Sequence, residues 1–107
     1  MSTFDKREEG FESKFAHDEE LRFKAHARRN KLVGLWAAEK LGMAGAAAET
    51  YAASIVAADL DNPNSDSVFG TLRKDFDEKG VAQSDHQIRR TMEEAMATAV
   101  EEIRAGR

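Results

Sequence analysis

The sequence predicts an all-α protein, a four-helix bundle preceded by a mobile, conditionally helical N-terminal arm. Strong helix formers, above all alanine, glutamate, lysine, arginine and leucine, are abundant, whereas proline occurs once, at Pro63. Apolar residues recur at helical spacing along most of the chain. The 107 residues contain no cysteine, and a single domain of this length buries enough surface on folding to need no disulfides.

The first helical pattern is the longest, from about residue 4 to residue 41, and it changes phase on the way. At about 100° per residue, Phe4, Phe11 and Phe15 form one apolar stripe. A second stripe, displaced by about a quarter turn, contains Leu21, Ala25, Arg28, Leu32, Leu35 and Trp36. Because one rigid helix cannot bury both stripes in one core, we predict that a new helix begins at Asp18, a favourable N-cap residue.

The remaining helices are expected at about residues 45–60 and 66–79 and from Ser84 onward. Gly80 should end the third helix, and Ser84 with Gln87 has the spacing of a capping box at the start of the fourth. The inner faces of these helices are predicted, in chain order, to carry Ala47, Tyr51, Ile55 and Ala58; Phe69, Leu72 and Phe76; and Ile88, Met92, Ala95, Ala99 and Ile103. Short connections make neighbouring helices antiparallel.

The division at Asp18 separates an N-terminal arm of residues 1–17, flexible when free, from a four-helix bundle of residues 18–107. The three phenylalanines of the arm need a surface, since burying one such side chain is worth on the order of 2 kcal/mol. The pattern leaves two alternatives open. Either the stripe covers the core of the bundle, or the arm folds into an amphipathic helix in a groove of a partner.

Charge adds a second candidate site. The net charge of −4 and the mixture of acidic and basic residues argue against a general nucleic-acid binder. The first helix of the bundle nevertheless carries a basic cluster, formed by Lys24, Arg28, Arg29 and Lys31, with His26 among them. One interpretation is binding of an anion or a nucleotide, and the other is a solvated face that pairs with nearby acids. Arg28 lies on the apolar stripe, so a buried partner for its guanidinium is a further alternative.

Motifs that would indicate catalysis or a metal site are absent from the sequence. No glycine precedes Lys-Ser or Lys-Thr, so there is no P-loop, and the HExxH pattern is missing. Asp59, Asp61 and Asp66 are close in sequence but lack the spacing and the glycine of an EF-hand. We therefore predict neither enzymatic activity nor a metal. No apolar run approaches roughly 20 residues and the start is charged, so neither a membrane span nor a signal peptide is expected.

The N-terminal third of the chain resembles a known family, the zeta subunit of alphaproteobacterial F-type ATP synthases. The similarity lies in the runs Thr3-Phe4-Asp5, Arg7-Glu8, Lys14-Phe15-Ala16-His17-Asp18-Glu19-Glu20-Leu21, Phe23-Lys24-Ala25, Ala27-Arg28-Arg29-Asn30-Lys31-Leu32, Gly34 and Trp36-Ala37-Ala38. It continues more thinly through Tyr51, the loop at 59–63, Phe69 and the last helix. The resemblance implies a four-helix bundle with a mobile N-terminal region, without enzymatic activity of its own, that inhibits ATP hydrolysis by the catalytic head.

The resemblance also implies a mechanism, in which the arm inserts between the catalytic alpha and beta subunits near the gamma stalk and blocks rotation in the hydrolysis direction. The partner-binding residues would then be Phe4, Asp5, Arg7, Glu8, Phe11, Lys14 and Phe15. A cytoplasmic protein is expected, associated through the ATP synthase with the cytoplasmic face of the inner membrane and monomeric when free.

No cofactor is expected to be required. Weak ATP or ADP binding is implied for some members of the family, and Lys24, Arg28, Arg29 and Lys31 are the candidate residues for it. The alternative function is therefore a small helical nucleotide-sensing or anion-binding protein that uses the Lys24–Lys31 cluster.

Overall fold

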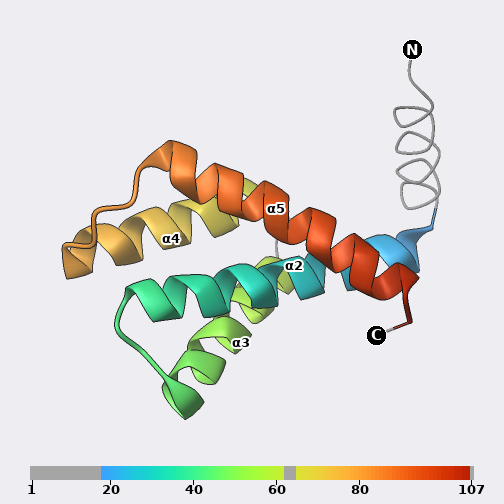
Figure 1. Cartoon of the computed structure of the whole chain (residues 1–107), viewed down its shortest axis with the longest axis horizontal. Coiled ribbons are helices and arrows are strands. Elements are labelled where there is room, and N and C mark those ends of the chain that lie inside the picture. The colour runs from blue at the N-terminus through green and yellow to red at the C-terminus, as the bar shows by residue number, and fades with distance from the viewer. Residues whose placement is uncertain (1–17, 62–64, 107) are drawn as a thin grey trace.

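The computed structural model of the chain describes residues 18–61 and 65–106. These residues form four α-helices: α2 (Glu19–Lys40), α3 (Gly45–Asp61), α4 (Ser65–Lys79) and α5 (Asp85–Arg104). Figure 1 shows α2 in the middle of the bundle, between α3 and α5, and α2 packs against both of these helices. The predicted all-α four-helix bundle is confirmed, whereas the arm of residues 1–17 lies outside the described residues.

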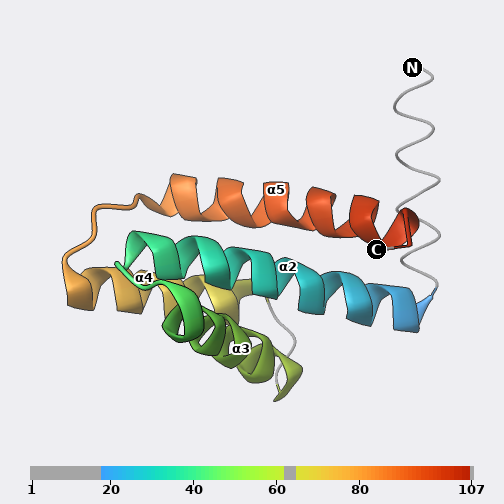
Figure 2. The same ribbon diagram turned by 60° about the horizontal axis from the view of Figure 1, so that its bottom comes forward.

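The helices alternate in direction along the chain. Two views place the α2–α3 and α4–α5 connections at one end of the bundle, and the start of α2 and the end of α5 at the opposite end (Figures 1 and 2). The antiparallel arrangement of neighbouring helices, expected from their short connections, is confirmed. Within residues 18–61 and 65–106, no helix combines the length and the apolar character that crossing a membrane requires.

The helix ends follow the local signals in the sequence. Asp18 is the N-cap of α2, and its Oδ1 accepts a hydrogen bond from the backbone N–H of Leu21 at 3.1 Å. Ser84 and Gln87 form the predicted capping box of α5, in which each backbone N–H donates to the side chain of the other residue, at 2.8 and 3.1 Å. Gly80 follows the end of α4 with φ of 68°, a left-handed conformation that glycine adopts readily.

All four helices contribute to one apolar core. Its buried members are Val33, Ala37, Ile55, Val68, Leu72, Phe76, Ile88, Met92 and Ala95. The ring of Trp36 packs edge-on against Phe76, with the two centroids 5.6 Å apart and the planes at 88°. The inner faces predicted for α4 and α5 are confirmed in Leu72, Phe76 and Ile88, which are fully buried.

The inner face predicted for α3 is wrong in part. Ile55 is buried as expected, but Ala47 and Ala58 are exposed, and Ala52 and Asp59 are buried in their place. Alanines occur on several faces of this helix, so the hydropathy pattern does not single out the face that meets α2. The position of the buried face is set by the contact between the two helices, which the sequence of α3 alone does not contain.

The single stripe predicted for α2 is too narrow, because this helix is covered on two sides. Val33, Ala37 and Ala38 are fully buried, whereas Leu32 and Trp36 of the predicted stripe are half-buried. Small residues predominate on the buried surface, which lets α2 approach its neighbours closely.

The closest approach of α2 and α3 occurs at Gly34. A Cβ atom added to Gly34 would lie only 2.7 Å from the Cα of Ala52 and 3.1 Å from its Cβ. Such a distance is shorter than carbon atoms tolerate, so any side chain at this position would push the two backbones apart. Gly34 therefore fixes the spacing between the helices that carry the candidate site.

Polar links hold α4 in place. The hydroxyl of Tyr51 in α3 donates to Asp75 Oδ2 at 2.6 Å, and burial together with this hydrogen bond raises the pKa of Tyr51 well above its usual range. Arg73 donates to the backbone oxygen of Gln83 at 2.6 Å and to Asp85 Oδ1 at 3.0 Å. These bonds fix the connection from α4 to α5.

Candidate functional site

The residues predicted to bind the partner enzyme lie in the arm, outside the described residues: Phe4, Asp5, Arg7, Glu8, Phe11, Lys14 and Phe15. The structure shows where this segment joins the bundle. Asp18 caps the first turn of α2, at the end of the bundle opposite to the α2–α3 and α4–α5 connections (Figure 1). The start of a new helix at this position, predicted from the change of phase, is confirmed.

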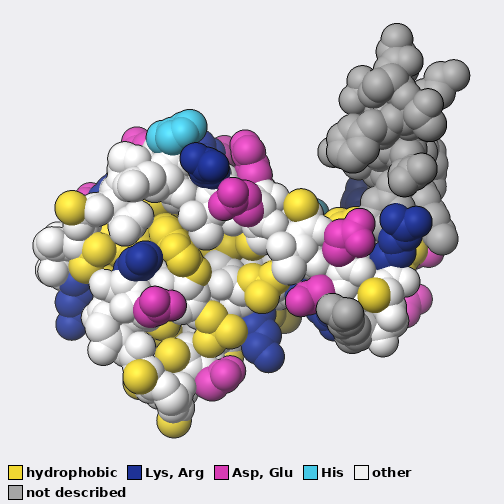
Figure 3. Space-filling view, viewed as in Figure 1, with side chains coloured by type: hydrophobic (Ala, Val, Ile, Leu, Met, Phe, Trp, Pro, Cys, Tyr) yellow, Lys and Arg dark blue, Asp and Glu magenta, His cyan; other side chains and the backbone are white. Residues whose placement is uncertain are grey.

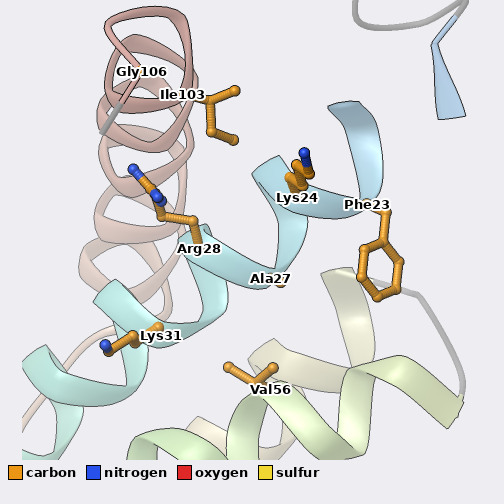
Figure 4. Close-up of a pocket in the computed structure, with 8 residues that line it drawn as sticks. All are labelled: Phe23, Lys24, Ala27, Arg28, Lys31, Val56, Ile103 and Gly106. Carbon is orange, nitrogen blue, oxygen red and sulfur yellow. The ribbon is translucent and has the colours of Figure 1, made fainter. Parts of the chain in front are cut away.

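Three members of the predicted basic cluster line one open pocket of about 720 Å³. Lys24, Arg28 and Lys31 are spaced so that they share one face of α2. The remaining walls are mainly apolar and come from α2 itself, from α3 and from the C-terminal end of the chain: Phe23, Ala27, Val56, Ile103 and Gly106. Figure 4 shows Arg28 extending toward α5, whereas Phe23 lies on the side of α3.

Acidic neighbours offset part of the positive charge of the pocket. Lys24 Nζ lies 3.1 Å from Glu20 Oε1, and Arg28 Nη1 lies 3.5 Å from Glu102 Oε1 on α5. About a third of both the Arg28 and Glu102 side chains is exposed, so the acidic partner of Arg28 lies at the rim rather than in the core. Acidic and basic side chains are interspersed over the face of the bundle in Figure 3, which agrees with the solvated-face interpretation.

The fourth cation, Arg29, does not line the pocket. It is only 4% exposed and lies among polar side chains at the interface of α2 and α3. Its Nε donates to Asn30 Oδ1 at 2.8 Å, and Asn30 Nδ2 donates in turn to Asp59 Oδ2 at 2.7 Å. Burial lowers the pKa of Arg29, and the charge of Asp59 opposes this shift. Arg29 therefore belongs to a buried polar cluster with Asn30 and Asp59.

His26 lies beside this buried polar cluster and responds to its charges. Burial is the largest cause of a lowered pKa of His26, and the positive charge of Arg29 lowers the pKa further. Asp59 acts in the opposite direction, and Arg22 adds a smaller lowering effect. The neutral imidazole is therefore the form that fits this position, as desolvation disfavours the charged one.

The sequence does not predict that Asn30 and Asp59 are buried. Asp59 is close in sequence to Asp61 and Asp66, but it belongs to the last turns of α3 and is 5% exposed. Its spacing from Ala52 and Ile55 places all three on one helical face, which is the signal that could have revealed it. No group of three or more potential ligands is arranged for a metal within the described ranges 18–61 and 65–106.

The pocket combines two lysines and one arginine with apolar walls. This chemistry suits a ligand that has an anionic part and an apolar part, and the volume of about 720 Å³ is in the range of small-molecule sites. The same surface also suits an amphipathic peptide with acidic residues at its edge.

Comparison with known proteins identifies the family. The family model for ATPase inhibitor subunit zeta matches residues 1–102, which include the arm and nearly all of the four helices. A search of curated proteins finds no match. The match agrees with the resemblance seen in residues 3–38, and it indicates a regulatory inhibitor of the ATP synthase rather than a catalytic subunit. The chain belongs to the ATPase inhibitor subunit zeta family.

Proposed function

We propose that the protein inhibits ATP hydrolysis by inserting residues 1–17, as an amphipathic helix, between the alpha and beta subunits of the catalytic head beside the gamma stalk. There the helix would act as a one-way wedge that blocks rotation in the hydrolysis direction. The observation that carries the proposal is that the family match begins at residue 1 and so includes the phenylalanine stripe. The protein would work at the cytoplasmic face of the inner membrane, where it is held by the enzyme.

The bundle and the arm would divide the work. Asp18 caps the first helix of the bundle, and the described residues of α2 to α5 form a shared apolar core. An arm that folds on binding loses conformational entropy, which makes its affinity modest for the surface that it covers. A second contact through the bundle would raise the local concentration of the arm and compensate for that loss.

Changing Phe4, Phe11 and Phe15 together to serine should abolish inhibition, because the variant loses the apolar stripe that would enter the catalytic interface. We expect at least a tenfold rise in the concentration that halves ATP hydrolysis by the cognate catalytic head. The melting temperature of the bundle, followed by circular dichroism, reports whether the core is affected.

The matched control carries three serines at exposed positions between or after the helices, Ala44→Ser, Ala82→Ser and Ala105→Ser. It should inhibit like the unchanged protein. Full inhibition by the phenylalanine variant would exclude the wedge. A loss of stability comparable with that of Phe76→Ala would instead assign the phenylalanine stripe to the core.

A second candidate function is weak binding of ATP or ADP in the pocket of Lys24, Arg28 and Lys31. The proposal is supported by the convergence of these cations with the ring of Phe23 around one pocket. An NMR titration of the full chain with ATP should shift the amides that line the pocket and leave those around Arg73 in α4 unaffected. Shifts confined to other surfaces would exclude this site.

A further inference from the structure

An apolar groove between α2 and α3 is left uncovered by the described residues. It joins the pocket beside Phe23 to a second hollow of about 360 Å³ along α3, and Lys31 and Val56 line both. We call this surface the α2–α3 groove; its main lining residues are Phe23, Ala27, Lys31, Ala53, Val56 and Leu60. Phe23 is 58% exposed and Leu60 is 49% exposed, and they are the exposed large hydrophobic side chains among the described residues.

The groove starts beside the point where the arm joins the bundle. Phe23 follows Asp18 by little more than one helical turn, and the groove then runs along α2 to Lys31, about 20 Å from Asp18 at 1.5 Å per residue. Residues 1–17 would span about 25 Å as a helix. Asp18 itself has an extended backbone, with φ of −110° and ψ of 101°, so the chain can change direction where α2 begins. The arm therefore has the length and the position to lie in the groove.

The charges of the arm match the edges of the groove. On a helical projection at about 100° per residue, Glu8 and Glu12 flank the phenylalanine stripe on one side, and Arg7 and Lys14 flank it on the other. The hollow along α3 has a cation from α2, Lys31, and an anion from α3, Glu49. A helix whose stripe faces the apolar floor can thus turn its acidic edge toward α2 and its basic edge toward α3.

We infer that, in the free protein, residues 1–17 fold back as an amphipathic helix into the α2–α3 groove of the same chain. The tether supplies an effective concentration in the millimolar range, so a weak contact is enough to populate the docked form. Its regulatory consequence rests on the proposed function: the groove and the catalytic head compete for the same phenylalanine stripe. The docked fraction of the protein then lowers the apparent affinity for the enzyme.

Paramagnetic relaxation measures the docking directly. The chain has no cysteine, so Ser2→Cys in the full-length protein accepts a single nitroxide label. The amides of Glu49 and Ala53 should broaden strongly, and those of Ala97 and Thr98 on the outer face of α5 should broaden weakly. Serine at positions 4, 11 and 15 should remove this difference.

Two results would overturn the inference. Equal or absent broadening at the two surfaces would show that the arm does not occupy the groove. Broadening that appears when a labelled chain is mixed with an isotopically enriched, unlabelled chain would assign the groove to a second copy of the protein.

Inhibition supplies the second test. Phe23→Ser combined with Leu60→Ser removes two exposed side chains of the groove and should strengthen inhibition at least threefold, as expected if the arm is docked about two-thirds of the time. The variant Ala44→Ser with Ala82→Ser is the control and should leave inhibition unchanged. Unchanged or weaker inhibition by the groove variant would contradict the competition.

The experiments can contradict the docking in the groove and the proposed inhibition independently of each other. If the arm is not docked but the phenylalanines are required for inhibition, the proposed function stands and the further inference falls. If the arm is docked but inhibition persists without it, the docking stands and the wedge falls.

Discussion

Asp59→Ala should lower the free energy of unfolding by about 3 kcal/mol, the scale observed when one partner of a buried charge pair is removed. Asp59 is 5% exposed, accepts a hydrogen bond of 2.7 Å from Asn30 Nδ2 and interacts electrostatically with the 4% exposed Arg29. Its removal leaves a buried guanidinium without that counter-charge and a buried amide without that acceptor. Urea unfolding followed by far-UV circular dichroism measures the loss.

Two variants identify the cause of that loss. Glu49→Ala removes an exposed acid from the same helix and should change the free energy of unfolding by no more than about 0.5 kcal/mol. Arg29→Met combined with Asp59→Asn removes both charges while keeping an acceptor for Asn30, and it should be more stable than Asp59→Ala. A loss for Asp59→Ala no larger than that for Glu49→Ala would contradict the assignment of this cluster as a buried link between α2 and α3.

Gly34→Ala should destabilise the protein although alanine is the better helix former. The new Cβ would lie 2.7 Å from the Cα of Ala52, and relief requires movement of a backbone rather than of a side chain. Overpacking of this kind costs about 1–3 kcal/mol, which exceeds the gain of up to about 1 kcal/mol from helix propensity. We expect a net loss of about 1–2 kcal/mol in the free energy of unfolding.

Gly70 provides a matched control within α4. It is exposed, and a Cβ atom added to it meets nothing within 4 Å. Gly70→Ala should therefore stabilise the protein by about 0.5–1 kcal/mol, from helix propensity alone. In urea unfolding, the same substitution should therefore lower the free energy of unfolding at Gly34 and raise it at Gly70. Stabilisation by Gly34→Ala would show that α2 and α3 can separate without cost.

The helix boundaries could be predicted from the sequence because they depend on local chemistry. The side chains of Asp18, Ser84 and Gln87 act on backbone groups a few residues away, and Gly80 acts through its own backbone. The buried faces of α4 and α5 were predictable for a similar reason, because large apolar residues recur on one side of each helix. In α3 many alanines hide the buried face, and only contact with α2 reveals it.

The candidate site could be predicted only in part, because neighbouring residues on a helix point about 100° apart. Arg28 and Arg29 are adjacent in the sequence, yet one faces α5 and the pocket while the other is buried against α3. The sequence shows a cluster of cations but does not show which of them the bundle encloses. Arg29 is buried beside Asp59, which is distant in sequence and stands near two other acids, Asp61 and Asp66.

The family model matches both the bundle and the arm. In the function that we propose, the arm is the inhibitory element. The described residues form capped helices around one apolar core, and we propose that the arm serves two surfaces in turn. One is the α2–α3 groove and the other is the catalytic head. The proposed inhibition and its regulation therefore both depend on the arm.

The most direct test of the account is the inhibition of ATP hydrolysis by the chain without residues 1–17. The deletion keeps Asp18, so the cap of α2 is preserved, and circular dichroism should show a folded helical protein. We predict that the cognate catalytic head, titrated with this protein, keeps its full rate of ATP hydrolysis, whereas the full chain stops it. Undiminished inhibition by the folded, shortened chain would contradict the central claim that residues 1–17 are the inhibitory element.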